Sequence, residues 1–137
     1  MEPPRSSQIL VIEDDENDCF LFMREIERAA LEDHVTVMVN GREAIEFLAK
    51  VDPPPLAIFL DLNLPGLGGI PLLDRLRHDP KYKNVPIIVM TGSDNPNDLK
   101  ECLRLGVTAY LTKPVKLSSF IKTIAHLFPE TSKSSSN

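Results

Sequence analysis

Cysteine and histidine are scarce in this 137-residue chain, and their scarcity excludes two kinds of site. The two cysteines, Cys19 and Cys102, each lie among residues with helical periodicity, where a free thiol behaves as a small buried hydrophobe. The three histidines, His34, His78 and His126, have no cysteine or carboxylate partners at the spacing of a zinc site. We therefore expect neither a disulfide nor a zinc centre, and we expect surface or structural histidines.

Excess positive charge and long apolar segments are also missing. The formal net charge is -5 and the pI is about 5.2, which argues against a partner such as DNA or an acidic membrane, because binding phosphate needs a basic face. No segment approaches the length of a membrane-spanning helix, and Met1–Ser7 has no apolar region of the signal-peptide kind. We therefore expect a cytoplasmic protein that binds neither DNA nor membrane.

Hydrophobic residues make up 42% of the chain, which suits one compact domain with a real core. We predict this domain over residues 8–128. The segments 1–7 and 129–137 are too polar to join the core, so we expect a flexible N-terminal segment and a flexible serine-rich tail.

Five short apolar runs alternate with helical patterns, which is typical of a parallel sheet covered by helices on both faces. The predicted strands are Gln8–Ile12, His34–Val39, Leu56–Leu60, Val85–Met90 and Thr108–Leu111. Several of these runs are almost continuously aliphatic, as in strands that are buried on both faces. The predicted fold class is therefore α/β, a three-layer (βα)₅ sandwich.

The predicted helices lie between these strands. Two helices are predicted at Gly41–Lys50 and Gly69–Arg77. A third is predicted at about Pro96–Leu105, between a capping Asn95 and the helix-ending Gly106. Two further helices are predicted from apolar stripes formed by Cys19, Phe22, Met23, Ile26 and Ala30 and by Leu117, Phe120, Ile121 and Ile124. We expect both stripes to pack on the sheet.

Polar residues follow four of the five predicted strands, at the edge where ligands bind in open parallel sheets. The four groups are Glu13-Asp14-Asp15, Asp61-Leu62-Asn63, Thr91-Gly92-Ser93 and Thr112-Lys113-Pro114. Each group alone has an ordinary explanation: Asp14 or Asp15 as a helix cap, Asp61 as a turn residue, Thr91 as a strand-end hydroxyl, Lys113 as a solvated cation. Their joint occurrence at one edge argues against coincidence.

Chemistry gives such a cluster a purpose. If Glu13, Asp14 and Asp61 lie together, like charges about 4 Å apart repel by about 4 kcal/mol at an effective dielectric of about 20, so the site needs a cation. Hard oxygen ligands select Mg²⁺. Asp61 is then the candidate nucleophile of a phosphoryl transfer, and Lys113 and the Thr91 hydroxyl would contact the phosphoryl oxygens.

The sequence resembles the receiver domains of bacterial two-component response regulators, including the chemotaxis-regulator-like single-domain members. The resemblance spans Gln8 to Phe128 and rests on four motifs in the family's order: Ile-Leu-Val-Ile-Glu-Asp at 9–14, Asp-Leu-Asn-Leu-Pro at 61–65, Val-Met-Thr-Gly at 89–92 and Tyr-Leu-Thr-Lys-Pro at 110–114. It implies a flavodoxin-like fold with parallel strand order 2-1-3-4-5.

The resemblance also implies roles for individual residues. Mg²⁺ would be bound directly by Asp14 and Asp61, through water by Glu13, and by the backbone carbonyl of Asn63, with Asp61 as the phosphoacceptor. Asp15, one residue beyond the acidic pair, is expected to cap the helix or line the pocket.

Three further positions match the family's switch and phosphate-binding residues. Thr91 and Tyr110 match the residues that relay phosphorylation to the surface. Lys113 matches the phosphate-binding lysine, which is followed in the family by a proline that is typically cis. The chain departs from the family at Gly68-Gly69, where Asp-Gly is usual, and at residues 107–109, before Tyr110.

The partners implied by the resemblance are a histidine kinase or a phosphotransfer protein as phosphodonor and a downstream protein as target. A homodimer through the fourth and fifth helices and the fifth strand is a further expectation. The motifs at 61–65 and 111–114 also resemble stand-alone regulators that pair with phytochrome-type kinases. We expect a phosphoacceptor switch rather than an enzyme, with only slow loss of phosphate from Asp61.

Two alternatives remain. The first is a phosphorylation-independent adaptor that keeps the receiver fold as an interaction surface, which the intact acidic pair, Asp61, Thr91 and Lys113 disfavour. The second is a hydrolase with an aspartyl nucleophile. Such an enzyme should have an acid two residues after the nucleophile, where this chain has Asn63, so turnover is disfavoured.

Overall fold

The computed structural model describes residues 9–64, 66, 68–92, 95–113 and 115–127, apart from the side chains of residues 32, 117 and 127. In chain order its elements are β1 (Ile9–Ile12), α1 (Glu16–Arg28), η1 (Glu32–His34), β2 (Val35–Met38), α2 (Gly41–Lys50), β3 (Ala57–Asp61), α3 (Gly69–Arg77), β4 (Ile87–Thr91), α4 (Pro96–Arg104), β5 (Ala109–Thr112) and α5 (Leu117–Leu127). The predicted flexible segments at 1–7 and 129–137 lie outside the described residues.

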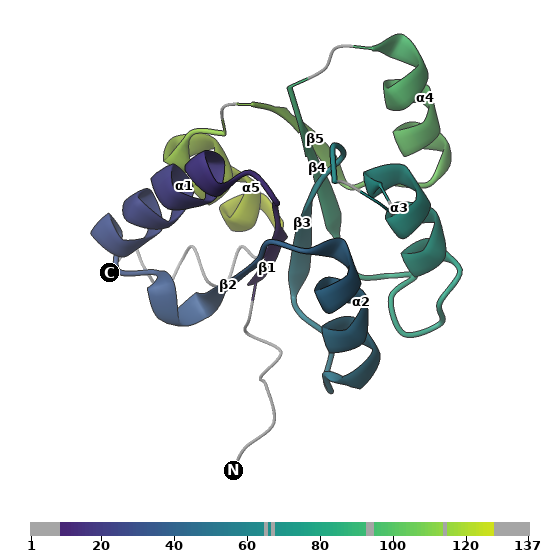
Figure 1. Cartoon of the computed structure of the whole chain (residues 1–137), viewed down its shortest axis with the longest axis horizontal. Coiled ribbons are helices and arrows are strands. Elements are labelled where there is room, and N and C mark those ends of the chain that lie inside the picture. The colour runs from purple at the N-terminus through teal and green to yellow at the C-terminus, as the bar shows by residue number, and fades with distance from the viewer. Residues whose placement is uncertain (1–8, 65, 67, 93–94, 114, 128–137) are drawn as a thin grey trace.

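The five strands form one parallel sheet in the order β2-β1-β3-β4-β5, which confirms the predicted fold class and topology (Figure 1). The order reverses at β1, so the carboxyl ends of β1 and β3 lie side by side at the switch point. In the described part of the chain, no helix combines the length and the apolar character needed to span a lipid bilayer.

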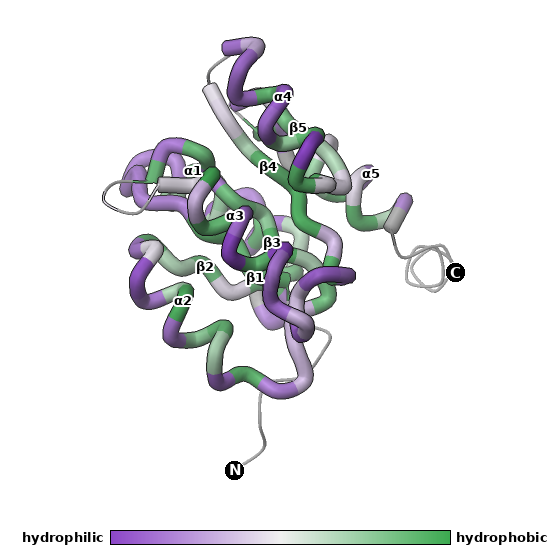
Figure 2. The backbone as a smooth tube through the Cα atoms, turned by 90° about the vertical axis from the view of Figure 1, so that its right-hand side faces the viewer, coloured by the Kyte–Doolittle hydropathy of each residue, from purple (hydrophilic) through white to green (hydrophobic). Residues whose placement is uncertain are grey.

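Helices cover both faces of the sheet, and alternate residues of each strand serve opposite faces (Figure 1). In β3, Ile58 and Leu60 pack toward α2, α3 and α4, while Ala57 and Phe59 pack toward α1 and α5. In Figure 2 the central strands are mostly hydrophobic, while the helices alternate between hydrophobic and hydrophilic stretches. Two apolar clusters thus fix the strand ends from both sides.

The local signals at the helix ends are mostly confirmed. Asn95 caps α4 by accepting a hydrogen bond from the backbone N–H of Asn97, and Gly106 adopts the left-handed backbone (φ 73°) that ends this helix. The prediction for Ala30 is wrong, because α1 ends at Arg28 and Ala30 has a φ of 58°. The chain leaves the helix there and turns toward β2.

The predicted stripe on α5 is partly wrong. Phe120 is fully buried, and its ring meets Phe59 at a tilt and Phe22 edge-to-face, with ring centroids 4.6 and 4.9 Å away. Ile121 is 41% exposed instead, because the next residue along a helix points about 100° away from its neighbour. Ile124 returns to the buried side and packs with the same cluster.

Candidate functional site

Asp61 is the last residue of β3 and is 1% exposed. The sheet holds its backbone, because Asp61 pairs with Met90 and the following N–H, of Leu62, donates to the Met90 carbonyl at 3.1 Å. Its Oδ1 accepts a hydrogen bond from the backbone N–H of Asn63 at 3.0 Å. The carboxylate is therefore fixed in place at the carboxyl end of the central strand, where the sequence predicts the site.

Glu13 and Asp14 leave the neighbouring strand at the same edge. The N–H of Glu13 donates to the Met38 carbonyl at 2.9 Å, and Glu13 is 5% exposed. Its Oε2 accepts from the N–H of Asp15 at 3.2 Å. Asp15 in turn caps α1 by accepting from the N–H of Asp18 at 2.9 Å, which confirms capping as its role.

Carboxylate oxygens of Glu13, Asp14 and Asp61 lie within 4.8 Å of one another. In the described part of the chain this is the one group of three side chains arranged to hold a metal ion, and it contains neither cysteine nor histidine. Oxygen ligands alone, two of them on buried residues, fit a hard divalent cation such as Mg²⁺ better than zinc. The donor set thus agrees with the cation expected from the sequence.

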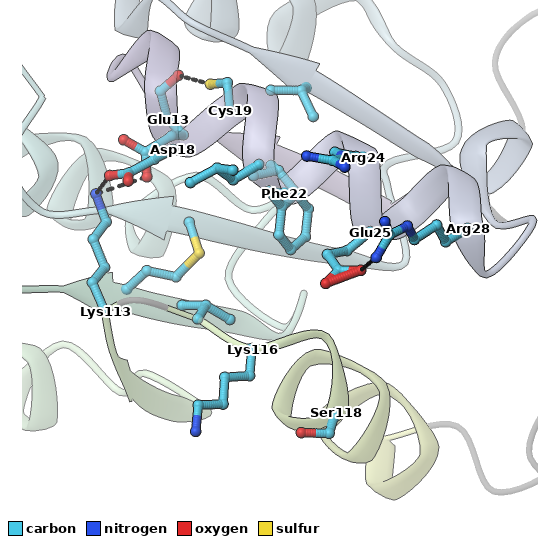
Figure 3. Close-up of a pocket in the computed structure, with 15 residues that line it drawn as sticks. Glu13, Asp18, Cys19, Phe22, Arg24, Glu25, Arg28, Lys113, Lys116 and Ser118 are labelled. Atoms are coloured by element: carbon cyan, nitrogen blue, oxygen red, sulfur yellow. Dashed lines mark hydrogen bonds and ion pairs between the residues drawn. The ribbon is translucent and has the colours of Figure 1, made fainter.

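Lys113 completes the site from the loop that follows β5. Its backbone N–H donates to the Thr91 carbonyl at 2.8 Å, which anchors the loop to β4. Its Nζ lies 2.7 Å from Glu13 Oε1 and 3.3 Å from Asp18 Oδ2 (Figure 3). The same Nζ lies 3.0 Å from Asp61 Oδ2. Asp18, in the first turn of α1, was not among the predicted site residues. The predicted cis peptide before Pro114 lies outside the described residues.

Burial and charge shift the pKa values of two groups in this cluster. Burial, and then the hydrogen bond and charge of Asp61, raise the pKa of Glu13 to about 7, against the opposing effect of Lys113. Burial alone would lower the pKa of Lys113, but hydrogen bonds to Glu13 and Asp61 raise it. The lysine therefore stays charged, and its ammonium partly neutralises the negative charge of the acidic cluster.

Thr91 and Tyr110, the predicted switch residues, lie on neighbouring strands. Thr91 ends β4, one position beyond Met90, the residue paired with Asp61, and it is fully buried. Thr91 therefore lies at the same edge of the sheet as Asp61. Tyr110 pairs with Val89, is half-buried, and packs against the apolar cluster beneath α3 and α4.

Gly69, the first residue of α3, backs directly onto the Asp61 loop. A Cβ at this position would lie 2.5 Å from the Leu62 Cα and 2.6 Å from the Asp61 carbonyl oxygen. The Gly69 N–H donates to the Leu62 carbonyl at 3.2 Å. Only glycine fits such an approach, so this residue sets the path of the chain that carries Asp61 and Asn63. Gly68 before it has a φ of 86°.

A cavity of about 620 Å³ opens beside the cluster, between α1 and the start of α5 (Figure 3). Glu13, Asp18 and Lys113 lie at one end of it, and Phe22, Met90 and Val115 line its apolar part. Glu13 and Lys113 can therefore be approached from solvent along α1.

Comparison with known proteins agrees with this geometry. The family described as the response regulator receiver domain matches residues 9–125. Among curated proteins, Response regulator Rcp1 of Synechocystis sp. is 31% identical over 127 residues, which cover 89% of this chain and 85% of Rcp1.

Solved structures give the same result. The bacteriophytochrome response regulator RtBRR is 33% identical with a TM-score of 0.76, covering 88% of this chain and 77% of that one. The phosphorylated cyanobacterial phytochrome response regulator RcpA is 29% identical with a TM-score of 0.76, covering 90% and 94%. The Mn²⁺-bound form of Rcp1 is 32% identical with a TM-score of 0.70, covering 87% and 89%.

Proposed function

The chain belongs to the response regulator receiver domain family of two-component systems, and from this membership we propose that it is a Mg²⁺-dependent phosphorylation switch with Asp61 as its phosphoacceptor. One observation carries the proposal: Asp61 is 1% exposed, yet its carboxylate lies among two further carboxylates and 3.0 Å from the Lys113 ammonium. A buried charge among like charges is costly for folding, so its retention argues for use in chemistry.

Mg²⁺ fits the oxygen atoms of this cluster. We propose that Asp14 and Asp61 bind the ion directly, Glu13 through water and Asn63 through its backbone carbonyl. A bound Mg²⁺ would neutralise charge on the phosphoryl group as it is transferred. The Mn²⁺-bound form of the similar protein Rcp1 supports a divalent cation in this pocket.

The proposed reaction transfers a phosphoryl group from a phosphohistidine of a histidine kinase or a phosphotransfer protein. A carboxylate oxygen of Asp61 attacks phosphorus, so a P–O bond forms while the P–N bond to the donor imidazole breaks. The backbone N–H of Asn63 orients the Asp61 carboxylate, and Lys113 and the Thr91 hydroxyl meet the charge of the phosphoryl oxygens. A phosphorylated structure of the similar RcpA supports this chemistry.

Signalling would follow from a shift between two surface states. Thr91 lies at the same edge of the sheet as Asp61, and Tyr110 lies on the adjacent strand β5. A phosphoryl group on Asp61 can therefore shift the equilibrium between two conformations of the surface formed by α4, β5 and α5. The proposed output is altered binding to a downstream protein, or a homodimer through this surface. The only chemistry expected of the domain itself is acceptance and slow loss of the phosphoryl group.

Intact mass spectrometry tests the proposal. The protein is incubated with acetyl phosphate with and without Mg²⁺, and compared with Asp61→Asn and with Asp74→Asn, an aspartate on the surface of α3. We expect a Mg²⁺-dependent phosphate adduct in the parent protein and in Asp74→Asn, and none in Asp61→Asn. No adduct in any protein would favour the phosphorylation-independent adaptor instead.

A further inference from the structure

The Lys113 ammonium has three N–H donors, and three carboxylates surround it. Glu13 Oε1 lies 2.7 Å from Nζ and Asp18 Oδ2 lies 3.3 Å from it (Figure 3). Asp61 Oδ2 lies 3.0 Å from Nζ, so each donor has an acceptor. Two of these carboxylates, on Glu13 and Asp61, also belong to the acidic triad that fits a divalent cation. The ammonium and a divalent cation must therefore compete for the same two carboxylates.

Asp18 differs from the other two partners of Lys113. It comes from the first turn of α1 instead of a strand end, and it does not belong to the acidic triad. Its side chain is 43% exposed, against 6% for Glu13 and 2% for Asp61. Asp18 can therefore hold the ammonium at the edge of the site, beside the cavity that both residues line.

We propose that Asp18 is a positioning residue for Lys113, which draws the ammonium toward α1 and so leaves Glu13 and Asp61 freer to bind the divalent cation. The inference rests on the proposed function, because it assumes that this cluster is the metal site. Asp18 thereby lowers the electrostatic cost of replacing the Lys113 ammonium by a metal ion at Glu13 and Asp61. It also keeps Lys113 near Asp61, where the lysine can contact the phosphoryl group.

Loss of the Asp18 charge should make Lys113 a stronger competitor. With Asp18→Asn the ammonium has only Glu13 and Asp61 as anionic partners, so a metal ion must displace it from both. A partly exposed ion pair of this kind changes an equilibrium by about two- to fivefold, and we expect the dissociation constant for Mn²⁺ to rise by about that factor.

The experiment titrates Mn²⁺ alone into the full chain and follows free Mn²⁺ by electron paramagnetic resonance. Glu16→Gln is the matched control, because it removes the same charge from an exposed residue in the same turn of α1. Asp18→Glu tests rescue by a carboxylate. We expect weaker binding for Asp18→Asn alone, and thermal unfolding of each variant separates this effect from a loss of folded protein.

A double-mutant cycle distinguishes positioning of Lys113 from direct attraction between Asp18 and the metal. In a Lys113→Ala background, Asp18→Asn should change Mn²⁺ affinity by much less than in the parent protein. Lys113→Gln serves as the second background if the alanine variant unfolds.

The outcomes separate this inference from the function on which it rests. An equal effect of Asp18→Asn in both backgrounds, or an effect no larger than that of Glu16→Gln, would overturn the positioning role and leave the metal site intact. Absence of saturable Mn²⁺ binding in the parent protein would instead contradict the metal site itself, and the positioning role with it.

Discussion

The close approach of α3 to the Asp61 loop gives a sharp steric prediction. Gly69 and Gly41 are both the first residues of helices, and neither has a positive φ, so alanine suits both backbones. A Cβ on Gly41 would lie 3.6 Å from Leu64 Cδ1, an ordinary contact with a movable side chain. A Cβ on Gly69 would lie 2.5 Å from the Leu62 Cα, which is backbone. Only Gly69→Ala must therefore displace the loop.

The expected magnitude follows from these distances. Overpacking against backbone costs about 1–3 kcal/mol, and 2.5 Å places Gly69→Ala near the upper end. Alanine also gains up to about 1 kcal/mol over glycine in a helix, a gain that Gly41→Ala keeps in full. The free energies of unfolding of the two variants should therefore differ by about 2–3 kcal/mol, with Gly69→Ala the less stable.

Urea unfolding followed by circular dichroism measures this difference, and Mn²⁺ titration of the folded variants measures its effect on the site. Gly69→Ala should weaken Mn²⁺ binding, because the displaced loop carries both Asp61 and Asn63. If Gly69→Ala unfolds at the same urea concentration as Gly41→Ala and binds Mn²⁺ equally well, the steric account of this contact is refuted.

Three further predictions concern titration and a buried cation. Burial, and then the charge of Glu13, raise the pKa of the Cys19 thiol to about 11, so its alkylation rate should rise about tenfold per pH unit up to that value; a plateau near neutral pH would contradict this. Because the pKa of Glu13 is about 7, its carboxyl is protonated below that pH, and Mn²⁺ affinity should rise from about pH 6 to about pH 8. Calorimetry that finds no proton release when Mn²⁺ binds at neutral pH would contradict this prediction. The Arg77 guanidinium donates to five backbone carbonyls around the ends of α3 and α4, so Arg77→Lys should cost about 1–3 kcal/mol in urea unfolding, while the exposed Arg75→Lys should cost almost nothing; equal stabilities would refute that role.

Local patterns were sufficient to predict the sheet and most of the helices. The aliphatic runs locate all five strands to within one or two residues, and the predicted helices at Gly41–Lys50 and Gly69–Arg77 have the bounds of α2 and α3 in the structure. The wrong predictions also come from local patterns. Ala30 and Ile121 fit an ideal helical stripe, but the stripe does not tell where a helix stops or which of two neighbouring apolar residues the core takes.

The site was predictable where residues directly follow strands, because strand order alone brings Glu13, Asp14, Asp61 and Lys113 to one edge. Contacts between distant segments were not. Asp18 is 95 residues from Lys113, and no periodicity links a first-turn helix residue with a loop after the last strand. The crowding at Gly69 depends likewise on how closely α3 packs on the end of β3, which spacing along the chain does not reveal.

The central claim, that Asp61 carries the phosphoryl group, is tested most directly by locating the acyl phosphate chemically. Borohydride reduces an aspartyl phosphate to homoserine, so protein phosphorylated by acetyl phosphate with Mg²⁺ is reduced, digested and sequenced by tandem mass spectrometry. We expect homoserine at position 61 only, and only when Mg²⁺ is present. Homoserine at position 14 or 18, or an unmodified position 61 in phosphorylated protein, would contradict the assignment.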